Sequence, residues 1–201
     1  MKDFKKMLIL SALVLSIVLF VSAVASAANP IVTITPAGYA KKVSVVLDQL
    51  AAPATIWVVN AEGTLLLEEK TEGAKFAKVF NLENLPEGSY KVIVTTDRKE
   101  IVQPITLNTS ALVVNDAARE EYFAPFIRVR EDAIDVMWLN NRLGDVSVAI
   151  LDEQGGIVYE EAMENVLKVE KRYKTSDLGK GNYTVRVSTP RKDYYQAIAV
   201  K

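Results

Sequence analysis

The amino-acid sequence predicts an all-β protein in which two tandem immunoglobulin-like antiparallel β-sandwich domains follow an N-terminal signal peptide. Three observations predict this fold. Apolar and polar residues alternate along short segments, which is typical of half-buried strands. Glycine and proline residues separate these segments, as they do at turns. One pattern of segments occurs twice within the 201 residues, which indicates two copies of one domain.

The first element is the signal peptide, expected at residues 1–27. Three lysines near the start provide a positive charge, an apolar run covers residues 7–24, and small residues occupy positions 25–27. These are the three parts of a secretory signal, with cleavage expected after Ala27. The alternative is an uncleaved membrane anchor, because the apolar run approaches the length of a bilayer span of about 20 residues.

The two β-sandwich domains are expected at residues 28–108 and 125–201, with a linker at residues 109–124. Residues 54–60 align with residues 146–152, and the alternating apolar positions coincide in the two stretches. About seven short strands per copy are typical of an immunoglobulin-like sandwich. We expect the strands near 31–35, 42–48, 54–60, 64–69, 75–81, 89–96 and 100–107, and near 126–130, 134–140, 146–152, 156–161, 166–174, 182–189 and 193–200.

A Leu-x-x-Gly-x-Tyr motif occurs once in each copy, just before the sixth expected strand. In immunoglobulin-like sandwiches a tyrosine at this place bonds through its hydroxyl to the preceding corner of the chain. The leucine is expected to fill the core, and the glycine to adopt a turn conformation that residues with a Cβ adopt poorly. The motif residues are therefore predicted to be structural: Leu85, Gly88 and Tyr90, then Leu178, Gly181 and Tyr183.

The second copy resembles the C-terminal sorting domain of the bacterial type IX secretion system. The features that carry the resemblance are Asp152, Gly155, Val158, Leu178, Gly181, Tyr183, Val185, Val187 and Lys201. The first copy matches more loosely, with Asn60 in the place of Asp152. These motifs are shared in part with fibronectin type III-like domains of the immunoglobulin fold. The resemblance implies a β-sandwich and an envelope or secreted location.

Composition argues against several classes of function. The chain has no cysteine and no histidine, which excludes Cys-His and Ser-His-Asp catalysis and leaves a Ser-Lys pair as a formal possibility. A net charge of −1 does not favour nucleic acid as a partner. Adjacent carboxylates such as Glu68 and Glu69 point to opposite faces of a strand, so they do not form a catalytic pair. We therefore expect no enzyme activity, no cofactor, no metal, and no membrane partner after signal cleavage.

Three aromatic residues are candidates for binding because the apolar alternation places them off the core face: Trp57, Trp138 and Tyr195. Exposed aromatic side chains on a sheet are typical of contacts with carbohydrate or protein. The alternative is that the face is wrongly assigned for one of the two sheets. The expected partner is an unknown protein or carbohydrate of the cell envelope.

These observations predict a secreted, periplasmic or cell-surface protein without enzyme activity, with a binding, adhesion or structural role in the bacterial envelope. The alternative is a type IX secretion substrate whose C-terminal domain is a sorting signal.

Overall fold

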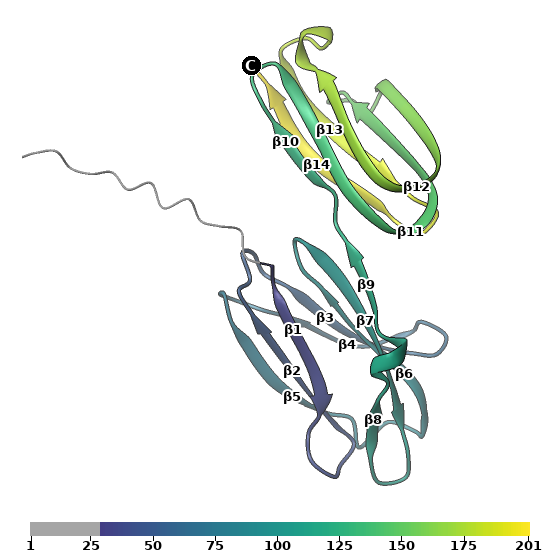
Figure 1. Ribbon diagram of the computed structural model, residues 1–201. Helices are drawn as coiled ribbons and strands as arrows, with labels where there is room; N and C mark the ends of the chain where they lie inside the picture. Colours follow the sequence, from purple (N-terminus) through teal and green to yellow (C-terminus); the bar gives the residue numbers. More distant parts are fainter. Residues whose placement is uncertain (1–28) are drawn as a thin grey trace, which may run out of the picture.

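The computed structural model describes residues 29–201, so the expected signal peptide at residues 1–27 lies outside the described residues. Two β-rich units lie end to end and are joined by strand β9 (Glu120–Phe123; Figure 1). The predicted all-β, antiparallel sandwich fold is confirmed. Within the described part, the two helices are three-residue 3-10 turns, and no helix there is long and apolar enough to cross a membrane.

The first sandwich has two sheets, and their strands lie within two residues of the expected positions. The strands are β1 (Ile31–Pro36), β2 (Lys42–Asp48), β3 (Thr55–Asn60), β4 (Leu65–Lys70), β5 (Phe76–Asn81), β6 (Gly88–Thr95) and β7 (Lys99–Leu107). One sheet has the order β1-β2-β5, and the other has the order β4-β3-β6-β7-β8, in which β8 is Leu112–Val114. Alternate residues of both sheets face inward and form one apolar core.

The expected linker at residues 109–124 contains strands of the first sandwich. It forms β8 (Leu112–Val114), the 3-10 turn η1 (Asp116–Ala118) and β9 (Glu120–Phe123). Both strands pair antiparallel with β7. Leu112 is 5% exposed and belongs to the core of the first sandwich. The connection to the second sandwich is thus an extension of a sheet.

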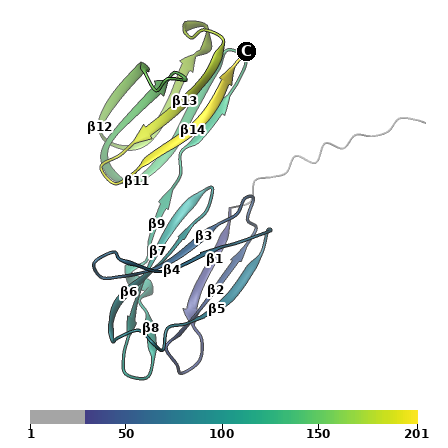
Figure 2. The ribbon, with the colours of Figure 1, turned by 180° about the vertical axis from the view of Figure 1, so that it is seen from behind.

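The second sandwich differs from the expected strand pattern, because two pairs of expected strands are continuous. Its strands are β10 (Phe126–Val129), β11 (Ala133–Leu151), β12 (Ile157–Lys174), β13 (Gly181–Ser188) and β14 (Asp193–Val200), with the 3-10 turn η2 (Thr175–Asp177) before β13. β11 and β12 pair along most of their length and bend together from one layer into the other (Figure 2). The pairing register shifts between Leu139 and Gly144 and again before Val146.

A difference in sequence explains why β11 continues through the bend. In the first copy, Pro53 lies between β2 and β3, and proline cannot donate a sheet hydrogen bond. The aligned residue is Asp145, whose Oδ1 accepts a hydrogen bond of 3.1 Å from the backbone N–H of Asn165 in β12. Asn165 has a φ of 49°, a left-handed conformation that asparagine tolerates better than most residues. This side-chain bond therefore links β11 to β12 at the bend, where the ladder of backbone hydrogen bonds is interrupted.

Candidate functional site

The two tyrosine corners have the expected geometry. Tyr90 Oη donates a hydrogen bond of 2.8 Å to the carbonyl oxygen of Pro86, and Tyr183 Oη donates one of 2.9 Å to that of Gly179. Tyr90 is 7% exposed, whereas the bond of Tyr183 lies at the surface. Both hydroxyls tie the start of a strand to the preceding loop, which is a structural function.

The other residues of the motif support the same corners. Leu85 and Leu178 pack against the apolar cores of the first and second sandwich. Gly88 has a φ of +150° and Gly181 has a φ of +157°, values that favour glycine because a Cβ would be strained there. The motif repeats because each sandwich needs the same turn into the same strand.

The three aromatic residues predicted to bind do not form one site. Trp57 lies on the outer face of the first sandwich, where it is half-buried between its cross-strand neighbours Glu68 and Ile93. Tyr195 is 63% exposed at the start of β14. Trp138 is separate from both, in the core of the second sandwich.

The predicted exposure of Trp138 is wrong, since only 7% of the residue is exposed. Ile134, Val136 and Trp138 alternate inward along β11. The alignment with the first copy had placed Trp138 opposite the exposed Val46. A shift of one residue reverses the face of every side chain in a strand. Trp138 and the buried Val146 are eight positions apart, whereas the corresponding inward residues Leu47 and Ala54 are seven positions apart. The stretch between Trp138 and Val146, which contains the bend of β11, therefore differs from its counterpart by an odd number of residues.

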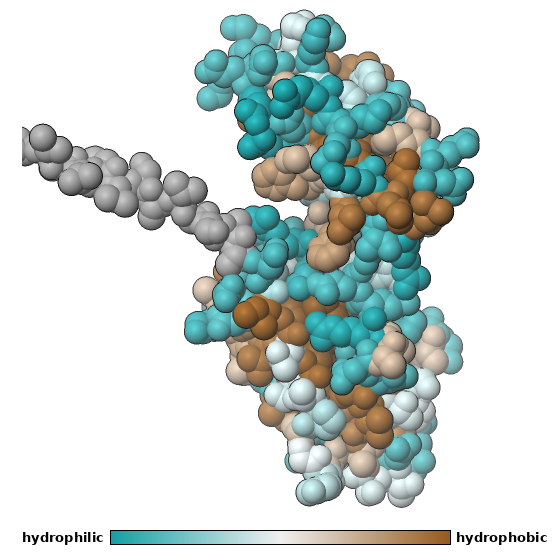
Figure 3. Space-filling view, viewed as in Figure 1, coloured by the Kyte–Doolittle hydropathy of each residue, from teal (hydrophilic) through white to brown (hydrophobic). Residues whose placement is uncertain are grey.

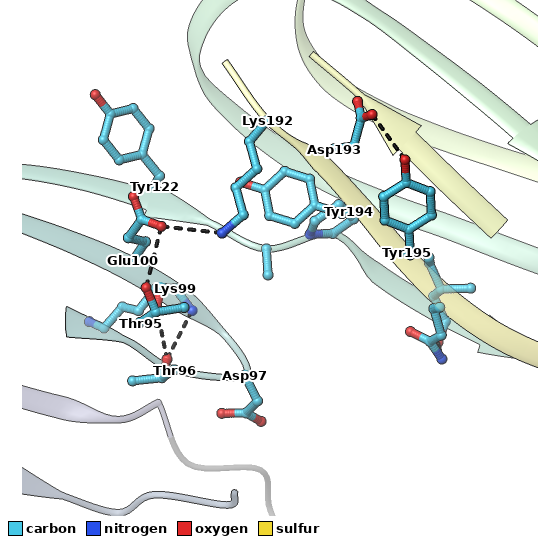
Figure 4. Close-up of a pocket in the computed structure, with 14 residues that line it drawn as sticks. Thr95, Thr96, Asp97, Lys99, Glu100, Tyr122, Lys192, Asp193, Tyr194 and Tyr195 are labelled. Carbon is cyan, nitrogen blue, oxygen red and sulfur yellow. Dashed lines mark hydrogen bonds and ion pairs between the residues drawn. The ribbon is translucent and has the colours of Figure 1, made fainter. Parts of the chain in front are cut away.

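A cleft between the two sandwiches is the best candidate for a functional site. It has a volume of about 300 Å³. Side chains from the end of the first sandwich and from the start of β14 face one another across it (Figure 4). The cleft is lined by Thr95, Thr96, Asp97, Lys99, Glu100, Tyr122, Ala124, Pro125, Ile127, Lys192, Asp193, Tyr194, Tyr195 and Gln196.

Tyr122 of β9 contacts two arginine side chains at one wall of this cleft. The guanidinium carbon of Arg191 lies 3.7 Å from the centre of its ring, and that of Arg142 lies at 5.2 Å. Such cation–π contacts gain strength when water is excluded from them. Tyr122 Oη donates a hydrogen bond of 2.5 Å to Glu120 Oε2, and Arg142 bonds to the other oxygen of Glu120 at 2.5 Å.

Glu100 of β7 is the central carboxylate of the interface. Its side chain is 11% exposed, and its two oxygens pair with Arg191 and with Lys192 Nζ, the latter at 3.2 Å. Burial raises the pKa of Glu100, but the hydrogen bond from Arg191 and the positive charges of Lys192 and Arg191 outweigh burial and leave the pKa below its ordinary value. The carboxylate therefore stays ionised and clamps the loop before β14 to the first sandwich.

Trp138 contributes to the same interface from inside the second sandwich. Its indole Nε1–H donates a hydrogen bond of 2.8 Å to the carbonyl oxygen of Phe123 at the end of β9, and its ring lies 6.0 Å from that of Tyr194. Asn141 in the bend of β11 bonds to the carbonyl oxygen of Glu121. The backbone of β9 is thus bonded to the second sandwich at two points.

The rim of the cleft combines an exposed ring with polar groups. Tyr195 Oη donates a hydrogen bond of 3.1 Å to Asp193 Oδ2, and most of its ring remains open to solvent. The cleft therefore offers stacking and hydrogen bonds to a polar ligand.

A separate apolar surface covers the bend of β11 and β12 (Figure 3), where Leu139, Leu143 and Leu167 are each more than half exposed.

The carboxyls whose pKa shift is resolved can be compared with the requirement for a general acid. A catalytic acid needs a carboxyl whose pKa is raised. The carboxyls with a resolved shift have pKa values below their ordinary range, each because of bonds to a cation or tyrosine: Glu100 with Arg191, Glu120 with Tyr122, Asp135 with Arg172 and Glu161 with Lys171. Among residues 29–201, no group of three acidic side chains is arranged to hold a metal ion.

Sequence reasoning missed Tyr122, Glu100 and Arg191. Tyr122 lay in the expected linker, and the charged residues resembled ordinary solvated side chains of strand ends. The signal that could have indicated the interface was opposite charge. Acidic residues occur at positions 100, 120 and 121, towards the end of the first sandwich, and basic residues occur at positions 142, 191 and 192 of the second.

The model of one protein family matches both copies. The family is described as "Secretion system C-terminal sorting domain", and the matched residues are 34–108 and 131–201. The chain belongs to this family. Each matched segment of this sorting-domain protein contains one tyrosine corner, and most of the connecting segment lies outside the match. The family gives the protein a secreted or cell-surface location in the type IX pathway.

No curated protein matches this sorting-domain protein significantly in sequence. Among solved structures, it is similar to a chain titled "Biofilm associated protein - BSP domain", at 17% sequence identity and a TM-score of 0.30. The similarity covers 84% of this chain and 29% of that chain. The sorting-domain protein thus spans less than a third of the length of that structure.

Proposed function

We propose that this chain is a non-enzymatic protein exported by the type IX pathway, and that its second sandwich acts as the sorting signal. The observation that carries the proposal is the family match over residues 131–201. This segment includes all the residues on which the sequence resemblance rests, from Asp152 to Lys201. If the second sandwich is used as a sorting signal, the protein reaches the cell surface. If it is not used, the protein stays in the periplasm.

A feature of the loop between β11 and β12 supports the second copy as the signal. Asp152 Oδ1 accepts hydrogen bonds from the backbone N–H groups of Gln154, at 3.0 Å, and Gly156, at 2.7 Å. The aligned Asn60 accepts one such bond, from Thr64 at 2.7 Å. The aspartate thus builds a more tightly bonded loop, exposed at its tip, in the place where the family has its Asp-x-x-Gly motif.

Reporter export tests the sorting role. A periplasmic reporter fused ahead of residues 125–201 is expected to reach the surface of a type IX-competent host. The matched control carries residues 28–108 in the same place, and a second control uses a host without the translocon. A reporter that stays in the periplasm in all cases would refute sorting by the second copy and leave a domain of structural or binding function.

The lack of enzyme activity is supported by the chemistry of the side chains. The chain has no histidine and no cysteine, and these are the commonest general base and the most reactive nucleophile. The carboxyls with a resolved pKa shift are all held in the ionised form, as described above. An assay of the purified protein against ester, peptide and glycoside substrates is expected to show no turnover.

A second candidate function is binding at the cleft between the sandwiches, with adhesion as its outcome. The exposed ring of Tyr195 at the rim of the cleft favours a carbohydrate or a protein of the cell envelope as the ligand. The test is binding of the protein to envelope polysaccharide, with Tyr195→Ala compared with Tyr39→Ala. Tyr39 is fully exposed in the first sandwich, so equal binding by the two variants would refute a role for the cleft.

A further inference from the structure

The last strand of each copy has a different environment at its outer edge. In the first sandwich, β8 pairs with the end of β7: Ile105 with Val114, Thr106 with Val113 and Leu107 with Leu112. Residues 105–107 align with residues 198–200 of β14. In the part of the chain that the structure describes, β14 pairs only with β13. The place that β8 takes in the first copy is therefore open in the second.

Backbone hydrogen bonds identify which groups are free at this edge. The N–H of Asn108 donates to the carbonyl oxygen of Ala111 at 2.9 Å, and the N–H of Asn115 donates to that of Pro104 at 3.0 Å. Because backbone groups of an antiparallel strand point to its two neighbours alternately, positions 104, 106 and 108 face β8. The aligned residues are Ala197, Ala199 and Lys201, which face the open edge of β14.

A hollow lies beside the open edge. It has a volume of about 670 Å³ and is lined by Val129, Arg130, Glu131, Thr175, Ala199, Val200 and Lys201. The hollow lies where the end of β10 comes next to β14 (Figure 1). The corresponding strands of the first copy, β1 and β7, both contact β8. There, Leu112 fills the space and is 5% exposed, whereas Val129 at the hollow is 37% exposed.

We propose that the free edge of β14 at residues 197–201 binds an extended segment of a partner protein, which adds a strand to the β11-β13-β14 sheet as β8 does to the first. Pairing with an exposed strand edge is a common mode of peptide recognition. The added strand would continue an existing sheet, and its pairing geometry is taken from the repeat within this chain. It does not depend on the sorting role.

The repeat also defines the chemistry of the partner segment. In β8, the first and third residues, Leu112 and Val114, pack against the core, while the second, Val113, is 48% exposed. The partner should thus have apolar residues at alternate positions. Lys201 is exposed and has no ion pair among the described residues, so an acidic residue just before the first apolar position complements its charge.

The experiment uses the full mature chain and a fluorescent peptide with the sequence of residues 108–117, in which Ala111 is replaced by Glu. Fluorescence anisotropy is expected to show saturable binding. N-methylation at the position of Val113 removes the N–H that faces β14 and should weaken binding at least about tenfold, as the loss of one to two backbone hydrogen bonds implies. N-methylation at the position of Val114, whose N–H faces away, is the matched control and should retain binding.

A protein variant tests the same edge from the other side. Ala199→Pro removes the free N–H and should abolish binding, whereas Ala199→Val keeps the N–H and should bind the peptide. The two modified peptides leave the protein unchanged, so they decide the matter if Ala199→Pro does not fold.

Several outcomes would overturn the proposal. These are no binding, equal binding of the two methylated peptides, or binding that survives in a folded Ala199→Pro variant, which would mean that the peptide displaces β8. A dimer that forms without peptide and is lost in Ala199→Pro would show that the occupant is a second copy of the chain, contrary to the proposal.

Discussion

Removal of the two corner hydroxyls should destabilise the two sandwiches unequally, although the motif is the same. In Tyr90→Phe, the buried ring keeps its packing, but the carbonyl oxygen of Pro86 loses a donor at 2.8 Å. Tyr90 is 7% exposed, so water replaces the donor poorly and the expected cost is about 1–3 kcal/mol. In Tyr183→Phe, the lost bond lies at the surface, where water can replace the hydroxyl. The expected cost there is below about 1 kcal/mol.

Native-state hydrogen exchange measures this difference because it reports on each sandwich separately. Tyr90→Phe should lower the opening free energy of the protected amides in β6 (Gly88–Thr95) and leave those of β13 (Gly181–Ser188) unchanged. Tyr183→Phe should produce a smaller change, confined to β13. Equal losses in both strands, or no loss in β6, would show that burial of the corner does not determine its energy.

Other substitutions test the core, the interface and the signal peptide. Trp138→Ala should cost about 3–5 kcal/mol in chemical denaturation, as for a buried tryptophan, and the half-buried Trp57→Ala only about 1 kcal/mol; a reversed order would contradict the assigned faces. The folded-state pKa of Glu100 lies below its ordinary value, so its stabilisation is complete above about pH 4.5 and is lost as the pH falls through the folded pKa. Carboxyl groups titrate over roughly pH 5 to 3. Over this range the Glu100→Gln variant should accordingly lose less stability than the parent protein. Mass spectrometry of the exported protein should find Ala28 at the N-terminus, and an intact Met1 would contradict cleavage.

Most of the first sandwich could be predicted from the sequence because its physical signals are local. Alternation determined the strands, Pro53 separated β2 from β3, and the repeat of Tyr90 and Tyr183 indicated a common corner. The continuous β11 could not be predicted, because the side-chain bond from Asp145 to Asn165 that holds its bend depends on the pairing of two strands. The inward orientation of Trp138 was missed because the alignment of the two copies did not show where a gap falls. A shift of one residue reverses which side chains of a strand face the core.

The candidate site was harder to predict than the fold, because it forms only where two domains meet. Arg191 lies on the ring of Tyr122 and pairs with Glu100, yet the three residues are far apart in the sequence. Each of them alone resembles an ordinary surface residue. The exposure of Tyr195 was predicted from alternation within one strand, which is the kind of local signal that a single sequence contains.

The joint at β9 has a mechanical consequence. This strand runs from the first sandwich towards the second (Figure 1), and its ladder with β7 extends from Val102–Glu120 to Lys99–Phe123. Because sheet hydrogen bonds are perpendicular to the strands, tension that pulls the sandwiches apart loads this ladder in shear, so its bonds resist together. The joint should transmit tension between the two sandwiches and should bend little before it breaks.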